Sequence, residues 1–206
     1  ALRRRDGSVV WTETTSHFVL DPQTGQFHLY GVSRDITERR GNERIQAAQF
    51  AVNRILAQSP QQHAAIVQVL EALTTGLGWL AAEFWQLSAD QSCLEWGAGW
   101  WASDDPALAQ FMQQSQSITF APGQGLVGQS WQQNKALWYN GLDSHPEYPR
   151  HAIGKAAGLE SAAAIPISIE DEPLGVMVFH DAAPHPFDDR LLAMLEDRER
   201  PYYEHR

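Results

Sequence analysis

Residues 161–180, with the sequence SAAAIPISIEDEPLGVMVFH, give the clearest structural signal in the chain. Two apolar runs, 161–169 and 174–180, lie on either side of the polar turn Asp171-Glu172-Pro173. Short apolar runs joined by such a turn predict a β-hairpin, and a hairpin requires antiparallel strands. We therefore expect a sheet that is mainly antiparallel.

The segments before this hairpin add further strands and helices. Strands are predicted over 79–87, 92–101, 118–120 and 136–140. Helices are predicted over 37–58, 66–76, 105–112, 126–132 and 188–199, with a small one ending at Gly158. Hairpins interleaved with helices predict an α+β fold, in which helices flank a central antiparallel sheet.

The first 36 residues form a separate pattern. Turn signals at Asp6-Gly7 and at 21–25 separate short apolar runs, which predicts hairpins. Two or three strands cannot bury a core alone, so these strands are expected to pack on the rest of this chain or on an upstream half. The predicted division is 1–36, a linker helix over 37–58, a main domain over 59–199 and a tail over 200–206.

The linker helix carries apolar residues at alternating steps of three and four positions. They are Ile45, Ala48, Val52 and Ile55. This spacing is typical of a heptad seam, and it predicts a homodimer formed through helices. Two heptads also fit ordinary core packing, so that alternative stays open.

Composition excludes several classes of protein. The formal net charge of −10 disfavours nucleic acid as a partner. The single cysteine, Cys93, cannot form an internal disulfide, which fits a reducing, cytoplasmic location. No apolar run approaches the length of about 18 residues that a membrane span needs.

Two N-terminal segments resemble the end of a PAS domain. They are Arg5-Asp6-Gly7-Ser8 through Trp11, and Gly31-Val32-Ser33-Arg34-Asp35-Ile36-Thr37-Glu38-Arg39. In that family the last strands lead into an ending of this type, which starts a signalling helix. Residues 1–36 thus correspond to the C-terminal part of the PAS fold, and no PAS ligand is expected here.

Residues 60–197 resemble a GAF domain. The motifs that carry the resemblance are FAPGQGLVG at 120–128 followed by Trp131, GLES at 158–161 leading into AIPI at 164–167, LGVMVF at 174–179, and FDD at 187–189. Tandem PAS and GAF modules resemble the input half of bacterial sensor histidine kinases and diguanylate cyclases. No kinase or cyclase motif occurs in these residues, so the chain itself is expected to be non-catalytic.

Glycines at 123, 125 and 128 match the pattern GxGxxG. A dinucleotide site needs this pattern inside a parallel βαβ unit, with an acidic residue about 20 positions further on. The surrounding sequence does not have that form. We therefore expect the glycines to shape a turn into a short helix.

The sequence assigns no cofactor. Cys93 has no adjacent histidine of the kind found in bilin-binding GAF domains, and we expect it to be buried and inert. Asn134-Lys135 matches part of the cyclic-nucleotide signature of the family, but its phenylalanine and its Asp-Glu pair are missing. His145, His151 and His180 are not at metal-ligand spacing, so neither haem nor a metal is supported.

The GAF resemblance implies a ligand pocket between the sheet and the loop 140–151. The candidate ligand-binding residues are Phe120, Trp138, Asn140, Arg150, His151 and His180. An arginine or histidine in the loop could meet an anionic group through charge-assisted hydrogen bonds. In the alternative interpretation the loop is simply solvated, and large aromatic side chains fill the pocket.

Three functions follow from these features. The first is a sensory input module that binds a small ligand and relays the signal through helices to an output domain. The second is a ligand-free module that dimerises and transmits strain. The third, more remote, is a GAF-fold enzyme of the free methionine sulfoxide reductase type, which needs several cysteines where this chain has one.

Overall fold

The computed structural model describes residues 1–5, 9–58, 62–145, 148–169 and 172–184. The chain divides into two compact units, residues 1–46 and residues 47–206, and each is considered on its own. The turn at Asp6-Gly7, the predicted helix over 188–199 and the tail 200–206 lie outside the described residues.

The first unit is built on hairpins. The short strands β1 (Leu2–Arg3) and β2 (Val9–Val10) pair with each other, and β3 (Thr12–Leu20) pairs antiparallel with β4 (Phe27–Asp35) over their whole length. The Asp21 carboxylate accepts hydrogen bonds from the Gln23 amide and the Thr24 hydroxyl and so fixes the turn between β3 and β4. The hairpins expected here are therefore present.

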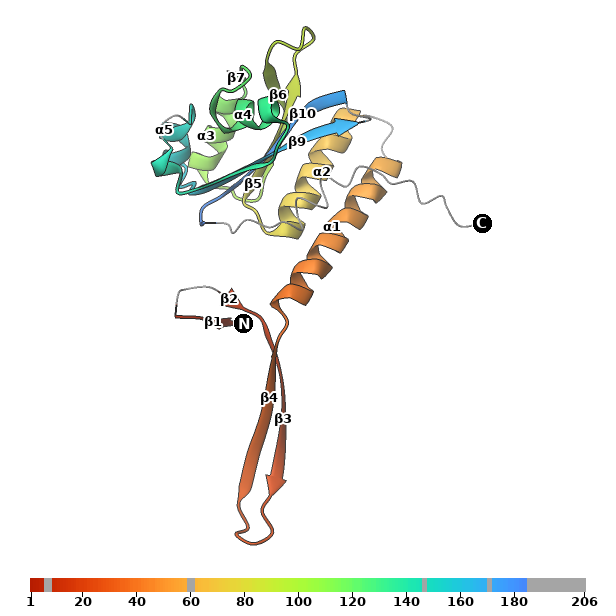
Figure 1. The fold of residues 1–206 in the computed structure, drawn as a ribbon, viewed down its shortest axis with the longest axis vertical. Coiled ribbons are helices and arrows are strands. Elements are labelled where there is room, and N and C mark those ends of the chain that lie inside the picture. The colour runs from red at the N-terminus through yellow and green to blue at the C-terminus, as the bar shows by residue number, and fades with distance from the viewer. Residues whose placement is uncertain (6–8, 59–61, 146–147, 170–171, 185–206) are drawn as a thin grey trace, which may run out of the picture. The chain divides into compact units, whose positions relative to one another are not determined.

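The second unit contains one sheet of six strands (Figure 1). Its order is β7-β6-β5-β10-β9-β8, and every neighbouring pair is antiparallel. The strands are β5 (Ala81–Leu87), β6 (Leu94–Trp101), β7 (Thr119–Phe120), β8 (Leu137–Asn140), β9 (Ser161–Ile169) and β10 (Glu172–Asp181). The predicted α+β fold with an antiparallel sheet is confirmed.

Helices cover both faces of this sheet. The helices are α1 (Thr37–Gln58), α2 (Gln62–Leu77), α3 (Pro106–Ser115), α4 (Gly125–Gln133) and α5 (His151–Ala156), with a 3₁₀ turn η1 at Leu142–Ser144. Helix α2 packs on one face, which we call the α2 face, and α3, α4 and α5 gather on the other, the α3 face (Figure 1). The Asp105 carboxylate caps α3 by accepting a hydrogen bond of 2.8 Å from the Ala107 amide, as its position before Pro106 predicted.

Residues along each strand alternate between the two faces. On the α2 face, Ala82, Phe84 and Phe179 pack with Leu70 and Leu73 of α2. On the α3 face, a separate apolar cluster forms from Ala81, Trp85, Leu94, Leu108, Phe111, Met112, Phe120, Leu126, Ala162, Ala164, Val176 and Val178, among others. The period of two residues thus decides which core each side chain joins.

The apolar seam of α1 is used within the second unit. Ala48 is only 2% exposed, and Val52 and Ile55 pack with it against the α2-face core. The three- and four-residue spacing therefore serves ordinary core packing here, the alternative left open above. Phe50, on the same helix, is 71% exposed.

The glycine-rich turn leads into α4. Gly123 and Gly125 have φ values of +79° and +57°, a region that favours glycine. A Cβ atom on Gly128 would overlap the carbonyl oxygen of Ala121. The turn predicted for these glycines is confirmed, and the antiparallel sheet around it differs from the parallel βαβ unit that a dinucleotide site needs.

Replacement of Gly128 by alanine tests this close approach. We expect Gly128→Ala to lower the free energy of unfolding by about 1–3 kcal/mol, because the new methyl group meets rigid backbone. Gly154→Ala is the matched control, since its Cβ would lie 3.7 Å from the Phe111 ring, an ordinary contact. Urea unfolding measures both, and equal losses in the two variants would contradict the explanation.

Candidate functional site

A buried carboxylate lies at the centre of the α3 face. Glu83 of β5 is fully buried, and strand alternation sets it on the same face as the apolar Ala81 and Trp85. A carboxylate in such surroundings is costly unless it is paired and hydrogen-bonded. Glu83 therefore requires partners from the elements that cover it.

Arg150 supplies the opposite charge. Its Nη1 atom lies 2.6 Å from Oε1 and 2.7 Å from Oε2 of Glu83, and both side chains are buried. The same Nη1 donates to the hydroxyl of Ser115 at 2.9 Å. Ser115 stands at the end of α3 and donates in turn to the Phe111 carbonyl, so α3 is tied to the ion pair.

Two more groups donate to Glu83. The indole Nε1 of Trp85 lies 3.0 Å from Oε2, and Nε2 of His180 on β10 lies 3.2 Å from the same oxygen. A carboxylate only accepts hydrogen bonds, so this contact requires the proton on Nε2 of His180. We call Glu83, Ser115, Arg150 and His180 the Glu83 cluster.

Aromatic rings surround the guanidinium of Arg150. Its Cζ lies between 4.9 and 5.6 Å from four ring centroids, those of Phe111, Trp85, Tyr148 and Phe120. At these distances a cation is attracted to the π-systems. The aromatic residues thus stabilise the buried charge together with Glu83.

The chain brings Arg150 to this place through its neighbours. Arg150 immediately precedes α5, and its carbonyl accepts the Gly154 amide of that helix. A Cβ on Gly125 would clash with the ring of Pro149, so the glycine turn allows residues 148–150 to approach closely. Glycine at 125 therefore serves the site as well as the turn.

The ionisation of the cluster follows from burial and charge. Burial opposes ionisation of Glu83, but the charge of Arg150 together with the neighbouring His180 and the hydrogen bonds from both outweighs it, and the pKa of Glu83 falls to about 2. Burial lowers the pKa of His180, which favours its neutral form. Burial also raises the pKa of Tyr148 to about 12, so its hydroxyl keeps its proton. The cluster therefore carries no net charge at neutral pH.

Several polar atoms of the site are buried without a partner. Among the described residues, Nε and Nη2 of Arg150, Oη of Tyr148 and Nδ1 of His180 find no well-aligned hydrogen bond. The Tyr148 hydroxyl lies close enough to Arg150 for both its charge and a loose hydrogen bond to act on the pKa of Tyr148, but the contact is not a well-aligned hydrogen bond. Each unsatisfied group costs about 1–3 kcal/mol, so such atoms mark where a water or a ligand binds.

The structure unites half of the predicted site residues. Phe120, Arg150 and His180 meet in or beside the Glu83 cluster. Asn140 is exposed at the end of β8, and His151 is half-buried as the first residue of α5.

Trp138 lies on the opposite face of the sheet from the Glu83 cluster. It pairs with Ala163 in the sheet and packs against Trp79 on the α2 face, with ring centroids 5.4 Å apart. Its neighbours Leu137 and Tyr139 face the α3 side instead. An error of one position moves a strand residue to the other face of the sheet.

Glu83 and Ser115 were missed. Glu83 is the one charged residue in the strand predicted over 79–87, and alternation sets it on the apolar face with Trp85. A charge in that position signals a buried partner and could have pointed to the site. Ser115 carried no comparable signal.

The other candidate groups do not gather. His145 stacks on Tyr139 at a centroid distance of 3.8 Å. Within the described ranges, no three His, Cys, Asp or Glu side chains could hold a metal ion. Cys93 is half-buried rather than buried as expected.

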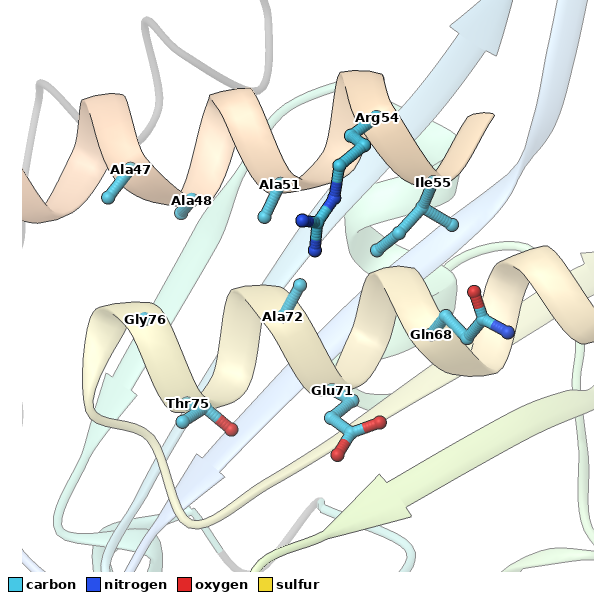
Figure 2. Close-up of a pocket in the computed structure, with 10 residues that line it drawn as sticks. All are labelled: Ala47, Ala48, Ala51, Arg54, Ile55, Gln68, Glu71, Ala72, Thr75 and Gly76. Carbon is cyan, nitrogen blue, oxygen red and sulfur yellow. The ribbon is translucent and has the colours of Figure 1, made fainter. Parts of the chain in front are cut away.

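A hollow lies between α1 and α2, away from the Glu83 cluster, with a volume of about 630 Å³ (Figure 2). Small side chains line it on both helices, including Ala47, Ala51 and Ala72. Figure 2 shows the Arg54 guanidinium reaching from α1 over this groove. The groove is lined by residues of the second unit alone.

Comparison with known families identifies the class of protein. The profile of the GAF domain matches residues 60–197, and the chain belongs to this family. A comparison with curated protein sequences finds no significant match. No helix in the described part of the chain is long and apolar enough to cross a membrane.

Solved structures of GAF domains share the fold. The GAF domain of a phosphoenolpyruvate-protein phosphotransferase from Coxiella burnetii is 16% identical, with a TM-score of 0.61 over 74% of this chain and 86% of that one. The nlh2 GAF domain of A. aeolicus is 14% identical, with a TM-score of 0.59 over 76% and 91%. Free methionine-R-sulfoxide reductase from Neisseria meningitidis, solved with its substrate, is 16% identical, with a TM-score of 0.56 over 75% and 87%.

Removal of the Glu83 charge tests the ion pair. We expect Glu83→Gln to lower the free energy of unfolding by about 3–5 kcal/mol, because Arg150 is left buried without a counter-charge. The double variant Glu83→Gln/Arg150→Met should recover part of this loss. Urea unfolding gives the values, with the exposed Glu95→Gln as the control, and a loss for Glu83→Gln no larger than the control's would refute the role of the pair.

The buried His180 predicts a loss of stability in mild acid. Its pKa is lowered by folding, so the unfolded chain binds the proton more tightly. Its contribution is complete above the ordinary pKa of 6.5 and decreases as the pH falls below that value. Glu83 contributes at lower pH, between 4.5 and about 2.

Urea midpoints measured between pH 8 and pH 5, a range about the histidine pKa, check this expectation. His180→Gln should flatten the pH dependence, whereas His17→Gln, at an exposed position on β3, should leave it unchanged. An unaltered slope in His180→Gln would show that other groups cause the acid sensitivity.

Proposed function

We propose that this chain is a non-catalytic sensory module that binds a small molecule at the Glu83 cluster and relays its presence to an output domain. The observation that carries the proposal is the set of buried polar atoms without partners, on Arg150, Tyr148 and His180. They lie within an apolar core, and concave, mostly apolar sites with a few polar groups are typical of ligand binding.

The relay follows from where the polar groups are attached. Arg150 precedes α5, Ser115 ends α3, and Glu83 and His180 lie on neighbouring strands. A ligand that bonds to Arg150 stabilises only those arrangements in which these elements meet. Binding therefore shifts the population between packings of the α3 face.

The parent protein is proposed to be a bacterial sensor histidine kinase or diguanylate cyclase in the cytoplasm. The PAS-like ending at 31–39 supports this context. Asp35 accepts the Thr37 amide at 2.9 Å, and the Thr37 hydroxyl accepts the Trp11 amide at 2.9 Å. These two hydrogen bonds fix the junction between β4 and the first residue of α1, as a signalling helix requires.

A homodimer is part of the proposal. The exposed Phe50 on α1 and the small side chains of the groove between α1 and α2 support association through these helices. Small residues allow helices to approach closely, and a large exposed ring adds apolar area to bury.

A reductase activity is not proposed. The chain has a single cysteine, whereas an enzyme of the free methionine sulfoxide reductase type needs several. Cys93 donates its amide to Ser88, five residues beyond Glu83, at 3.2 Å. A strand rises about 3.3 Å per residue, so Ser88 lies about 16 Å along the chain from Glu83, and Cys93 lies beside Ser88 rather than in the Glu83 cluster.

The second candidate is a ligand-free relay. It is favoured by the packing of Trp85 against Phe120, with ring centroids 4.7 Å apart, and of Trp85 against Trp96 at 5.5 Å. In this case ordered waters form hydrogen bonds with the buried polar atoms, and aromatic side chains fill the remaining volume around the Glu83 cluster.

Native mass spectrometry of the purified chain separates the two functions. We expect a retained small molecule that denaturation releases, and an assembly of two chains. Ser115→Ala, which removes one partner of Arg150, should retain less of the molecule, while Glu95→Gln should retain the wild-type amount.

A chain that carries no molecule, and whose melting temperature is unchanged by a broad panel of metabolites, would reject the sensor and leave the ligand-free relay. A strictly monomeric chain at high concentration would reject association through α1 and α2.

A further inference from the structure

The guanidinium of Arg150 forms its well-aligned hydrogen bonds through one nitrogen only. Glu83 and Ser115 both contact Nη1, at 2.6 to 2.9 Å. The Nε and Nη2 atoms, which carry three of the five N–H groups, are buried and have no well-aligned acceptor among the described side chains and backbone, although the Tyr148 hydroxyl lies close to the guanidinium.

These two atoms form one edge of the planar group. The Nε–H and one Nη2–H point in the same direction, with the spacing of the two oxygens of a carboxylate. We propose that this edge binds the carboxylate of a small monocarboxylic acid. The inference rests on the proposed ligand-binding function and names the class of ligand.

The charge of the site favours a single negative charge on the ligand. Glu83 and Arg150 cancel each other, and burial keeps His180 neutral. A monocarboxylate therefore brings one net charge into the apolar interior, where a phosphate dianion would bring two. Since each unpaired buried charge costs several kcal/mol by desolvation, the monoanion is preferred.

Among the residues that the structure describes, no second carboxylate acts on Arg150. Glu83 is the carboxylate within reach, and it already receives hydrogen bonds from Arg150, Trp85 and His180. A water molecule can bridge the two N–H groups but is uncharged, whereas a carboxylate accepts each of them on a separate, negatively charged oxygen. Hydrogen bonds in which both partners are charged are stronger than those to water, so a carboxylate displaces water from this edge.

The surroundings of the edge suit an apolar body on the ligand. The rings of Phe111 and Tyr148 lie 4.9 and 5.5 Å from Cζ of Arg150. The Tyr148 hydroxyl keeps its proton and has no aligned acceptor in the described residues, so it offers a further donor. A short aliphatic or aromatic acid combines these features.

Arginine side-chain NMR tests the assignment directly. The probes are propionate and phenylacetate, each compared with its carboxamide, and the signal is the ¹H–¹⁵N resonance of Nε. We expect one Nε–H resonance, assigned by its loss in Arg150→Lys, to move saturably with each acid. The carboxamides should bind at least about tenfold more weakly, since they lack the charge and the second acceptor.

Two variants sharpen the test. Arg150→Lys keeps a cation beside Glu83 but has no parallel pair of donors, so its affinity for the acids should fall at least about tenfold. Arg54→Lys, at an exposed position on α1, controls for general anion binding and should not change the affinity. If Arg150→Lys does not fold, the comparison of acids with carboxamides in the wild-type chain decides alone.

Four results would overturn the inference. If carboxamides bind as tightly as the acids, the paired hydrogen bonds between Arg150 and a carboxylate are excluded. If inorganic phosphate binds more tightly than the acids, the preference for a monoanion is excluded. If the chain retains a neutral molecule and the Arg150 resonance does not respond to any acid, the sensor proposal stands and the proposal of a carboxylate ligand is rejected. No retained molecule and no response to any probe would reject both proposals.

Discussion

The buried ion pair between Glu83 and Arg150 is the interaction on which the α3 face depends. It joins residues 67 positions apart, and the same carboxylate reaches His180, 97 positions away. Apolar packing of similar volume would stabilise the fold at least as well, because both charges had to leave water. Stability alone therefore does not account for the pair, which is why we propose that it serves ligand binding.

Local patterns in the sequence were enough to predict the sheet and its hairpins. Asp171-Glu172-Pro173, Asp105-Pro106 and the glycines at 123–128 each act over a few residues, so their structural meaning can be derived without the rest of the chain. The face on which Trp138 lies could not be derived in this way, because it depends on a register that a shift of one residue reverses. The pairing of Glu83 with Arg150 is a long-range contact that no local pattern contains.

The seam of α1 shows a second limit of sequence reasoning. Ala48, Val52 and Ile55 have the spacing of a coiled coil, yet they complete the core beneath α2. Both uses need an apolar stripe on one side of a helix, so spacing alone cannot separate them. The exposed Phe50 lies off that stripe and takes no part in this core.

Solved structures at 13–16% identity share the fold, because strand alternation, turns and helix caps can each be formed by many different sequences. The interior of the site has no such tolerance, since each buried polar atom needs a partner of the correct kind and direction. This chain has no second cysteine for redox chemistry, but it has an arginine with one paired nitrogen and one unpaired edge. The Glu83 cluster is neutral overall and is enclosed by aromatic rings. It has more hydrogen-bond donors than acceptors, which suits the proposed ligand, since a carboxylate accepts hydrogen bonds.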